Sequence, residues 1–255
     1  TSDASQAAGF QEDRDEDQAA DGRPNAMGVA TQNHGVAVDP WEVSMVWAYS
    51  MKWRPMPVFQ SYFAYTPYLD QLNAEAAQHA PDDQMIIRAT TIPTRVWEMP
   101  VDDRNPMWES PRYTLTLVCN FSFVTADKRW MLLQKSVNRC GDPSPRALIR
   151  QVSANERVTV PSAGANQIVI ASFLPARPNP LATLTALVFK NTNPLEASVD
   201  GRIFRLPEGV ASGPLLTVLP KLSVWPSECK GQTLAPSMTV RHPGEVRFRT
   251  IDLIR

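Results

Sequence analysis

The chain has 255 residues, of which 23 are Pro and only 11 are Gly, and its formal net charge at pH 7 is −1. This length allows one large domain or two of ordinary size. No apolar run of roughly 18 residues or more occurs, so we expect no membrane-spanning helix. The lack of a glycine-rich phosphate-binding pattern argues against a nucleotide-dependent enzyme. The high Pro content favours short strands and rigid loops over long helices.

The start of the chain is strongly acidic. Residues 1–22 carry a charge of about −6, with Arg14 as their only basic residue, which leaves about +5 for the remainder. Because this segment has few apolar residues to bury, residues 1–35 are predicted to form a disordered acidic leader. The basic residues of the remaining chain form no stripe, so no nucleic-acid partner is expected.

Residues 36–142 are predicted to form a portion that mixes helix and strand. Residues 41–50 fit both the helical and the strand period only in part, so both remain open. The best helix spans 66–80, because Thr66 suits an N-cap, Pro67 suits the first helical position, and the apolar residues that follow share one face.

Strands become more frequent later in the chain. A short strand is expected within 81–89, and residues 110–136 begin as a helix or a strand and end as a hairpin-like strand pair. From residue 143, short apolar or alternating segments are separated by Pro, Gly or Asn at intervals of roughly ten to fifteen residues. This pattern predicts an antiparallel β-sandwich of jelly-roll type over 143–255. The predicted fold class is therefore α+β, with the mixed portion packed on the sandwich.

The most unusual stretch is "MKWRPMPVFQSYFAYTP", residues 51–67, which holds five aromatic residues and three Pro. Its rings could pack in a core, form a ligand shelf, or contact a membrane or a membrane partner. We favour packing because aromatic side chains are more often buried. The shelf stays open as an alternative, since aromatic faces beside hydroxyls and an amide suit sugar rings. Its candidate ligand-binding residues are Trp53, Arg54, Gln60, Tyr62, Tyr65, Arg104 and Trp108.

A second candidate site lies in the loop "VDDRNPMWESP". Asp103 and Glu109 are weak candidates for a catalytic pair, because two carboxyl groups beside Trp97 and Trp108 suit glycoside chemistry at separations of roughly 5 to 9.5 Å. The alternative is a structured loop in which Arg104 pairs with an acidic residue. We favour the structured loop.

The three Cys residues bear on the cellular compartment. Cys119 lies in an alternating apolar segment, where a buried free thiol is expected. Cys140 and Cys229 lie in polar loops, and we predict a disulfide between them, with free thiols as the open alternative. This bond would stabilise the fold by about 4–5 kcal/mol on the chain-entropy model and would imply an oxidising compartment. Dispersed Cys and only three His indicate no metal site, and no cofactor is expected.

The segment "WRPMPVFQSYFAYTPYLDQLNAE" and the loop "DDRNPMWESP" resemble the extracytoplasmic C-terminal portion of large bacterial multi-spanning membrane proteins of unknown or glycosyltransferase-like function. That family has a pattern near W-R-P-x-P-V-F-Q-S-Y-x-A-Y-T-P-x-L-x-x-x-N, followed by one near I-D-x-R-x-P. The later segment "DGRIFRLPEGVASGPLLTVLP" is similar to a strand pair of the family. The residues that match the first pattern are Trp53, Arg54, Pro55, Pro57, Val58, Phe59, Gln60, Ser61, Tyr62, Ala64, Tyr65, Thr66, Pro67, Leu69 and Asn73.

The resemblance covers about residues 36–225, and the family's preceding transmembrane helices are missing from this chain. It implies an extracytoplasmic, membrane-associated domain of the cell envelope whose partner is a membrane-embedded domain or subunit. The expected function is a non-catalytic domain that binds glycan or assists a glycosyltransferase-like membrane partner. The alternatives are a carboxylate-dependent glycoside hydrolase or transferase, and a structural subunit of an envelope complex with the aromatic stretch as its interface.

Overall fold

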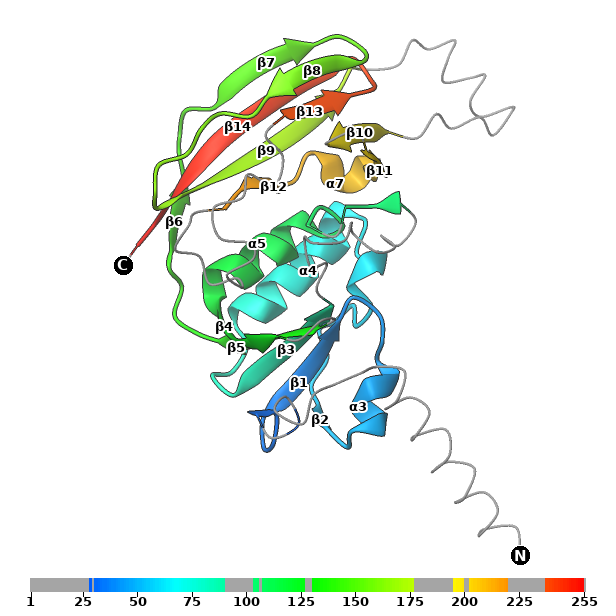
Figure 1. Cartoon of the computed structure of the whole chain (residues 1–255), viewed down its shortest axis with the longest axis vertical. Helices are drawn as coiled ribbons and strands as arrows, with labels where there is room; N and C mark the ends of the chain where they lie inside the picture. Colours follow the sequence, from blue (N-terminus) through cyan, green and yellow to red (C-terminus); the bar gives the residue numbers. More distant parts are fainter. Residues whose placement is uncertain are drawn as a thin grey trace, which may run out of the picture.

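The structure is a computed structural model that describes Gly28 and residues 30–89, 103–105, 107–126, 130–176, 195–199, 202–219 and 237–254. Within these residues the chain is mixed α/β, with most of its regular structure in strands and only a few short helices. The chain folds in successive layers, in which one sheet (sheet A), a helix layer and two further sheets (sheets C and B) follow one another (Figure 1). Residues 1–27 of the predicted leader lie outside the described residues.

Sheet A has the strand order β2–β1–β3–β5–β4. β1 runs parallel to β2 and β3, whereas β5 runs antiparallel to β3 and β4. Both faces are covered, since Val36 packs with α3 (Ser44–Ala48) on one side and Ala37 faces the helix layer on the other. This explains why β1 is buried along its whole length. The strands are β1 (Gly35–Asp39), β2 (Lys52–Trp53), β3 (Gln84–Ala89), β4 (Phe121–Ala126) and β5 (Trp130–Lys135).

The predicted helix after Thr66 is confirmed as α4 (Pro67–Gln78). The Thr66 hydroxyl accepts a hydrogen bond from the backbone N–H of Leu69 at 3.2 Å, and Pro67 lies in the first turn. These are the local signals from which the helix start was predicted. A short 3-10 helix, η1 (Ser61–Phe63), precedes α4.

The ambiguous segment after Ser110 forms α5 (Pro111–Asn120) rather than a strand. Its buried residues Tyr113, Leu117 and Val118 follow helical spacing and contact the same core as Ala77 of α4. Alternating Thr and Leu in this segment suggest a strand, but packing against α4 outweighs the weak local preference.

Sheets B and C are formed by the later part of the chain, beginning at Cys140. Sheet B has the order β11–β10–β13–β8, and sheet C has the order β12–β9–β14–β6, with β7 pairing the first half of β14. All pairings in both sheets are antiparallel. The strands are β6 (Cys140–Pro143), β7 (Leu148–Val152), β8 (Glu156–Thr159), β9 (Gln167–Pro175), β10 (Glu196–Val199), β11 (Arg202–Arg205), β12 (Leu215–Val218), β13 (Ser237–Val240) and β14 (Gly244–Leu253).

Sheet C contributes its two faces to two different cores. Val169 and Phe173 of β9 point into the core that sheet C shares with sheet B. Ile168 and Ile170, at the alternate positions of β9, lie in the core formed with α5 and sheet A. A short helix, α7 (Glu208–Ala211), precedes β12 and contacts α4 and β9.

Charged side chains from neighbouring elements cap the two main helices. The Asp70 carboxylate, on α4, accepts hydrogen bonds from the backbone N–H groups of Arg112 and Tyr113 at the start of α5, both at 3.0 Å. The Lys135 ammonium donates to the last carbonyls of α4, and the Arg139 guanidinium donates to carbonyls at the end of α5. Burial lowers the pKa of Lys135, and it lowers the pKa of Arg139 to about 10. Each charge has the sign that its helix end favours.

Replacing Asp70 by Asn is expected to change how stability depends on pH. Burial raises the pKa of Asp70 above its ordinary value of 3.8, although the hydrogen bonds from Tyr113 and Arg112 oppose this shift. The folded state therefore binds more protons than the unfolded state between the two pKa values. The stability advantage of the wild type over Asp70→Asn should increase as pH falls from about 7 to about 4. Urea unfolding of both proteins across this range measures it, and a constant or decreasing advantage would contradict the raised pKa.

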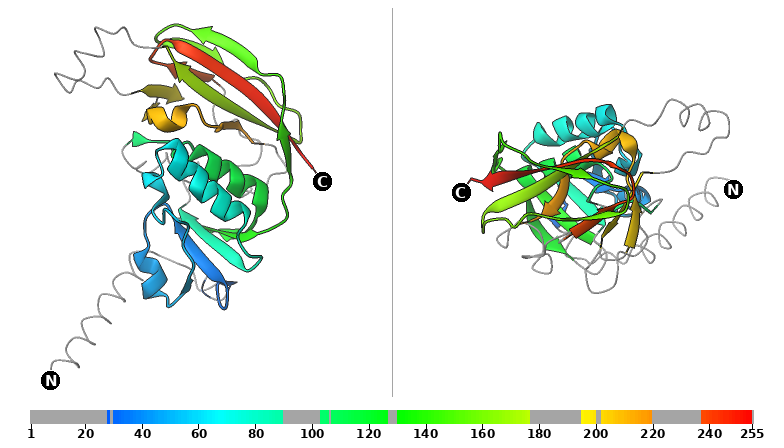
Figure 2. Two further views of the ribbon diagram at one scale, coloured as in Figure 1. Left: turned by 180° about the vertical axis from the view of Figure 1, so that it is seen from behind. Right: turned by 90° about the horizontal axis from the view of Figure 1, so that it is seen from above.

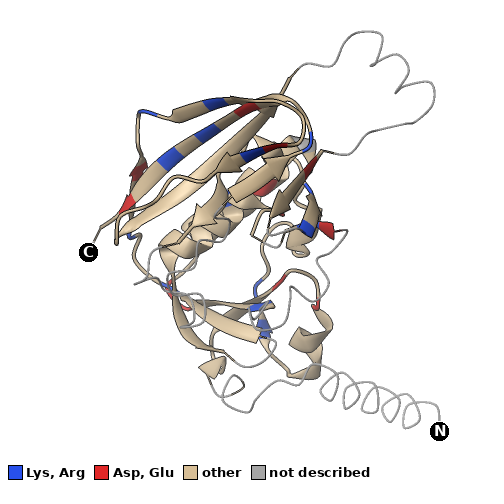
Figure 3. Ribbon diagram, turned by 45° about the horizontal axis from the view of Figure 1, so that its top comes forward, with Lys and Arg blue, Asp and Glu red and all other residues tan. Residues whose placement is uncertain are grey.

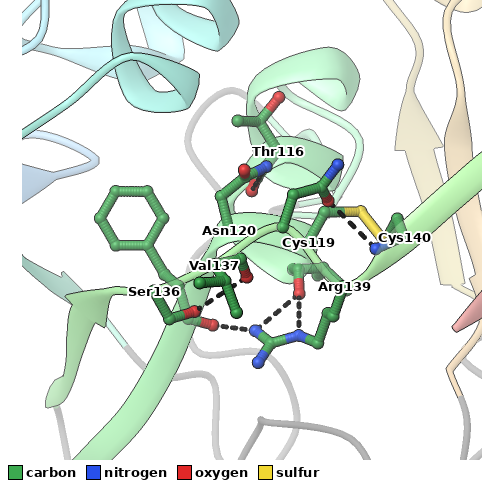
Figure 4. Close-up of a disulfide and its surroundings, with 10 residues drawn as sticks. Thr116, Cys119, Asn120, Ser136, Val137, Arg139 and Cys140 are labelled. Atoms are coloured by element: carbon green, nitrogen blue, oxygen red, sulfur yellow. Dashed lines mark hydrogen bonds between the residues drawn. A yellow bond between two sulfur atoms is a disulfide. The ribbon is translucent and has the colours of Figure 1, made fainter. Parts of the chain in front are cut away.

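The structure corrects the predicted disulfide. Cys140 is bonded to Cys119, with Cα atoms 5.3 Å apart, and not to Cys229, which lies outside the described residues. Cys119 lies at the end of α5 rather than in a strand, so β6 passes beside it. Arg139, which lies next to this bond (Figure 4), donates hydrogen bonds to the Val118 and Phe121 carbonyls. The free-thiol prediction for Cys119 is therefore wrong as well.

Candidate functional site

The candidate site is a group of exposed rings that we call the aromatic face. It comprises every large aromatic side chain that is exposed among the described residues, and all of them fall between residues 47 and 68. The other exposed large apolar side chains are aliphatic and come from other parts of the chain. The favoured packing interpretation of residues 51–67 is therefore wrong for Trp53, Phe59, Phe63 and Tyr65. The aromatic face consists of Trp47, Trp53, Phe59, Phe63, Tyr65 and Tyr68, with exposed fractions of 44%, 50%, 45%, 46%, 44% and 73%.

Non-aromatic side chains hold this segment to the body of the protein. Met56, Ser61 and Ala64 are buried, whereas the rings between them point outward. The Ser61 hydroxyl donates to the Asp39 carboxylate, and the Ser61 carbonyl accepts a hydrogen bond from the Ser110 hydroxyl at 2.8 Å. The pattern of burial is thus the reverse of the usual one near η1, where Ser61 and Ala64 are inside and Phe59 and Phe63 are outside.

Two further contacts fix the backbone of the segment. The Asn73 side chain, on α4, accepts from the Val58 N–H at 2.8 Å and donates to the Val58 carbonyl at 3.0 Å, as a neighbouring strand would. The Arg104 guanidinium donates to the Tyr62 carbonyl at 2.6 Å. With Pro55 and Pro57 restricting the chain as well, the segment is held in one conformation.

The rings contact one another mainly edge to face. Trp53 and Phe59 have centroids 6.1 Å apart and planes at 83°, and Trp41 and Tyr62 are arranged similarly at 6.3 Å and 88°. The Arg104 guanidinium lies over the ring of Tyr65, 5.4 Å from its centroid. Phe63 lies closer to Tyr62, with centroids 4.2 Å apart and planes at 32°. These contacts support Trp53, Phe59, Phe63 and Tyr65 and leave much of each of these rings to solvent.

A shallow apolar groove adjoins the aromatic face, between α3 and β2. It has a volume of about 620 Å³, and Trp47 and Trp53 belong to both the groove and the face. Its walls are mainly hydrocarbon, with two serines as the polar exceptions, so it suits an apolar group better than a polar one. The groove is lined by Val43, Ser44, Val46, Trp47, Ser50, Met51 and Trp53.

Arg54, a predicted ligand-binding residue, forms an ion pair with Asp83. Its guanidinium donates two hydrogen bonds to the carboxylate, at 2.5 and 3.0 Å. This contact raises the pKa of Arg54 and lowers the pKa of Asp83. The guanidinium lies directly over Gly35, where a Cβ atom would come within 2.5 Å of it. Arg54 therefore fastens β2 to the start of β3, while Gln60 remains partly exposed beside the rings.

The two carboxyl groups of the predicted catalytic pair do not both reach the surface, where a substrate could contact them. Asp103 is exposed, with a φ of 56°, whereas Glu109 is only 4% exposed. Trp108 is also buried, at 2% exposed, and its indole N–H donates to the Leu216 carbonyl at 2.8 Å. Trp108 thus anchors the loop on the core between sheets B and C. Trp97, the other ring proposed for this site, lies outside the described residues.

A buried ion pair under the aromatic face was missed by sequence reasoning. Asp39 ends β1, and Arg88 lies at the paired position of β3, with 2.5 Å between Oδ2 and Nη1. The two side chains are only 2% and 7% exposed. Burial also raises the pKa of the neighbouring Tyr113 well above its ordinary value. The sequence does show one charged residue near the end of each of these two apolar strands. That they form an ion pair can be inferred only when the register of β1 and β3 is known.

Among the described residues, no group of three or more His, Cys, Asp or Glu side chains is placed to hold a metal ion. No helix in the same part of the chain is long and apolar enough to cross a membrane. The chain matches no protein-family model, no curated protein and no solved structure.

Proposed function

We propose that this chain is a non-catalytic domain of a membrane-associated assembly in the cell envelope, and that the aromatic face is its contact surface. The observation that carries this proposal is the confinement of all exposed aromatic rings in the described residues to one segment. Exposing large apolar groups opposes folding, so a concentrated set of them on a fixed backbone is typical of an interaction site. The membrane-embedded partner implied by the family resemblance fits such a surface.

Three features support parts of this proposal. The Cys119–Cys140 disulfide agrees with an extracytoplasmic location, because disulfides persist in oxidising compartments. The burial of Glu109 disfavours the alternative of a glycoside hydrolase, which needs two carboxyl groups at its substrate. For the fold itself, two antiparallel sheets around one core support the proposal that the later part is a sandwich of jelly-roll type.

Glycan binding is the second candidate function. The perpendicular pair of Trp53 and Phe59 offers ring surface for stacking, with the Gln60 amide and the Tyr65 hydroxyl nearby in sequence. If this function is correct, soluble cell-envelope oligosaccharides should raise the melting temperature and shift tryptophan fluorescence, and Trp53→Ala should abolish both effects. Saturating oligosaccharide without either effect would remove this candidate.

Site-specific photo-crosslinking tests the contact surface. With p-benzoylphenylalanine in place of Phe63, ultraviolet irradiation of intact cells is expected to give discrete adducts in the membrane fraction. The matched control carries the same probe at Val137, which is 85% exposed but lies far from the aromatic face in sequence. Equal adducts at both positions, or none at Phe63, would contradict the assignment of the aromatic face as a contact surface.

A further inference from the structure

We propose that the aromatic face inserts its rings directly into the interfacial region of a phospholipid bilayer. This inference rests on the proposed function, because it names the medium that the contact surface meets. The rings come from α3, β2, the loop before η1, η1 and the start of α4. These elements follow one another along one side of the molecule, which both side views show (Figures 1 and 2).

The chemistry of the exposed side chains favours a bilayer interface. Trp and Tyr carry a large apolar ring with one polar atom, and they are enriched where hydrocarbon meets the headgroups. Trp47, Trp53, Tyr65 and Tyr68 all belong to the aromatic face, and Phe59 and Phe63 add fully apolar rings. A sugar site would instead need several polar groups converging on one ring.

The distribution of charge points in the same direction. From Val43 to Leu69 the chain has no acidic residue, and its only charged residues are Lys52 and Arg54. Lys52 is exposed next to Trp53, where its ammonium can reach lipid phosphates. Lys, Arg, Asp and Glu are instead frequent along the strands of the sheets at the other end of the molecule (Figure 3). The segment that carries the rings thus adds the exposed charge of Lys52 and no carboxylate of its own, while Arg54 is paired with Asp83.

The groove between α3 and β2 adds a place for hydrocarbon. Val46 and Met51 line it together with the two exposed tryptophans of the face. An apolar groove beside two inserted tryptophans offers room for part of an acyl chain. The hydrogen bonds of Ser61 and Asn73 fix the backbone that carries the neighbouring rings. Insertion therefore costs little conformational entropy of the protein backbone.

Co-sedimentation with lipid vesicles tests this inference on the full chain. The protein is expected to pellet with vesicles of phosphatidylcholine and with vesicles that also contain phosphatidylglycerol. Its tryptophan fluorescence should be quenched by lipids that carry bromine on their acyl chains. The double variant Trp53→Ala/Phe63→Ala should bind at least about tenfold more weakly to both kinds of vesicle, because two half-exposed rings no longer enter the lipid.

The matched control is Leu148→Ala/Ile149→Ala on β7, which removes two exposed apolar side chains of 43% and 49% exposure and should leave vesicle binding unchanged. Both variants should keep the wild-type melting temperature, which separates lost binding from lost folding. If the protein binds neither kind of vesicle, the inference is overturned. It is also overturned if the protein binds in a salt-sensitive way and Trp53→Ala/Phe63→Ala does not weaken this binding. If vesicle binding fails while Phe63 crosslinks to a protein in cells, the proposed function stands without the bilayer contact.

Discussion

Replacing Arg88 by Met is expected to lower the free energy of unfolding by about 3–5 kcal/mol. The substitution leaves the Asp39 carboxylate buried without its positive partner, while the Ser61 hydroxyl still donates a hydrogen bond to it. A buried charge that has lost its partner costs far more than the pair itself contributes. Urea unfolding monitored by circular dichroism measures the loss.

The second ion pair of sheet A provides the control. Arg54→Met breaks the contact with Asp83, whose side chain is 40% exposed, and water screens the remaining charge. Its effect on stability should be much smaller than that of Arg88→Met. The double variant Asp39→Asn/Arg88→Met should regain part of the loss, since no isolated charge remains buried. Equal losses in Arg54→Met and Arg88→Met would show that burial of Asp39 does not determine the effect.

Removing the disulfide, by Cys119→Ala/Cys140→Ala, is expected to lower the free energy of unfolding by about 3 kcal/mol. The bond closes a loop with a sequence separation of 21 residues that contains the hairpin of β4 and β5. Without the bond this loop gains freedom in the unfolded chain, while the hydrogen bonds of Arg139 still hold the end of α5. Denaturant unfolding of the variant and of the reduced wild type should give similar losses.

Cys229→Ala is the matched control for the disulfide, because it changes the third cysteine and leaves the Cys119–Cys140 bond intact. This variant should unfold like the wild type under oxidising conditions. Peptide mapping without reduction should recover one linked pair that contains Cys119 and Cys140. A linked peptide with Cys140 and Cys229 would instead restore the pairing predicted from the sequence.

Local signals in the sequence were enough to predict some elements. Thr66 and Pro67 identified the start of α4, because capping depends on residues within one turn. The strand-rich character of the later chain also followed from its short alternating segments. The conformation of residues 111–120 did not, because their β-branched residues fit a strand until packing against α4 is known.

The site was harder to predict because burial depends on contacts between distant parts of the chain. Ser61 binds Asp39, and this contact turns a small polar residue inward and its aromatic neighbours outward. Sequence composition favoured the opposite arrangement. The disulfide was mispredicted for a related reason, since the sequence left residues 111–120 open between a helix and a strand, and it is the helix that brings Cys119 next to β6.

Sheet C packs against both sheet B and the helix layer, and this limits where the chain can be cut into stable fragments. Ile168, Ile170, Leu216 and Ile251 face the helix layer, so a fragment that begins at β6 would expose this row of aliphatic residues to water. A fragment that ends before Cys140 would uncover Tyr113 and Leu117 and lose a cysteine of the disulfide. Neither fragment is expected to stay soluble alone. The parts of the chain before and after Cys140 therefore depend on each other for folding. We expect recombination between genes to transfer them together and not separately.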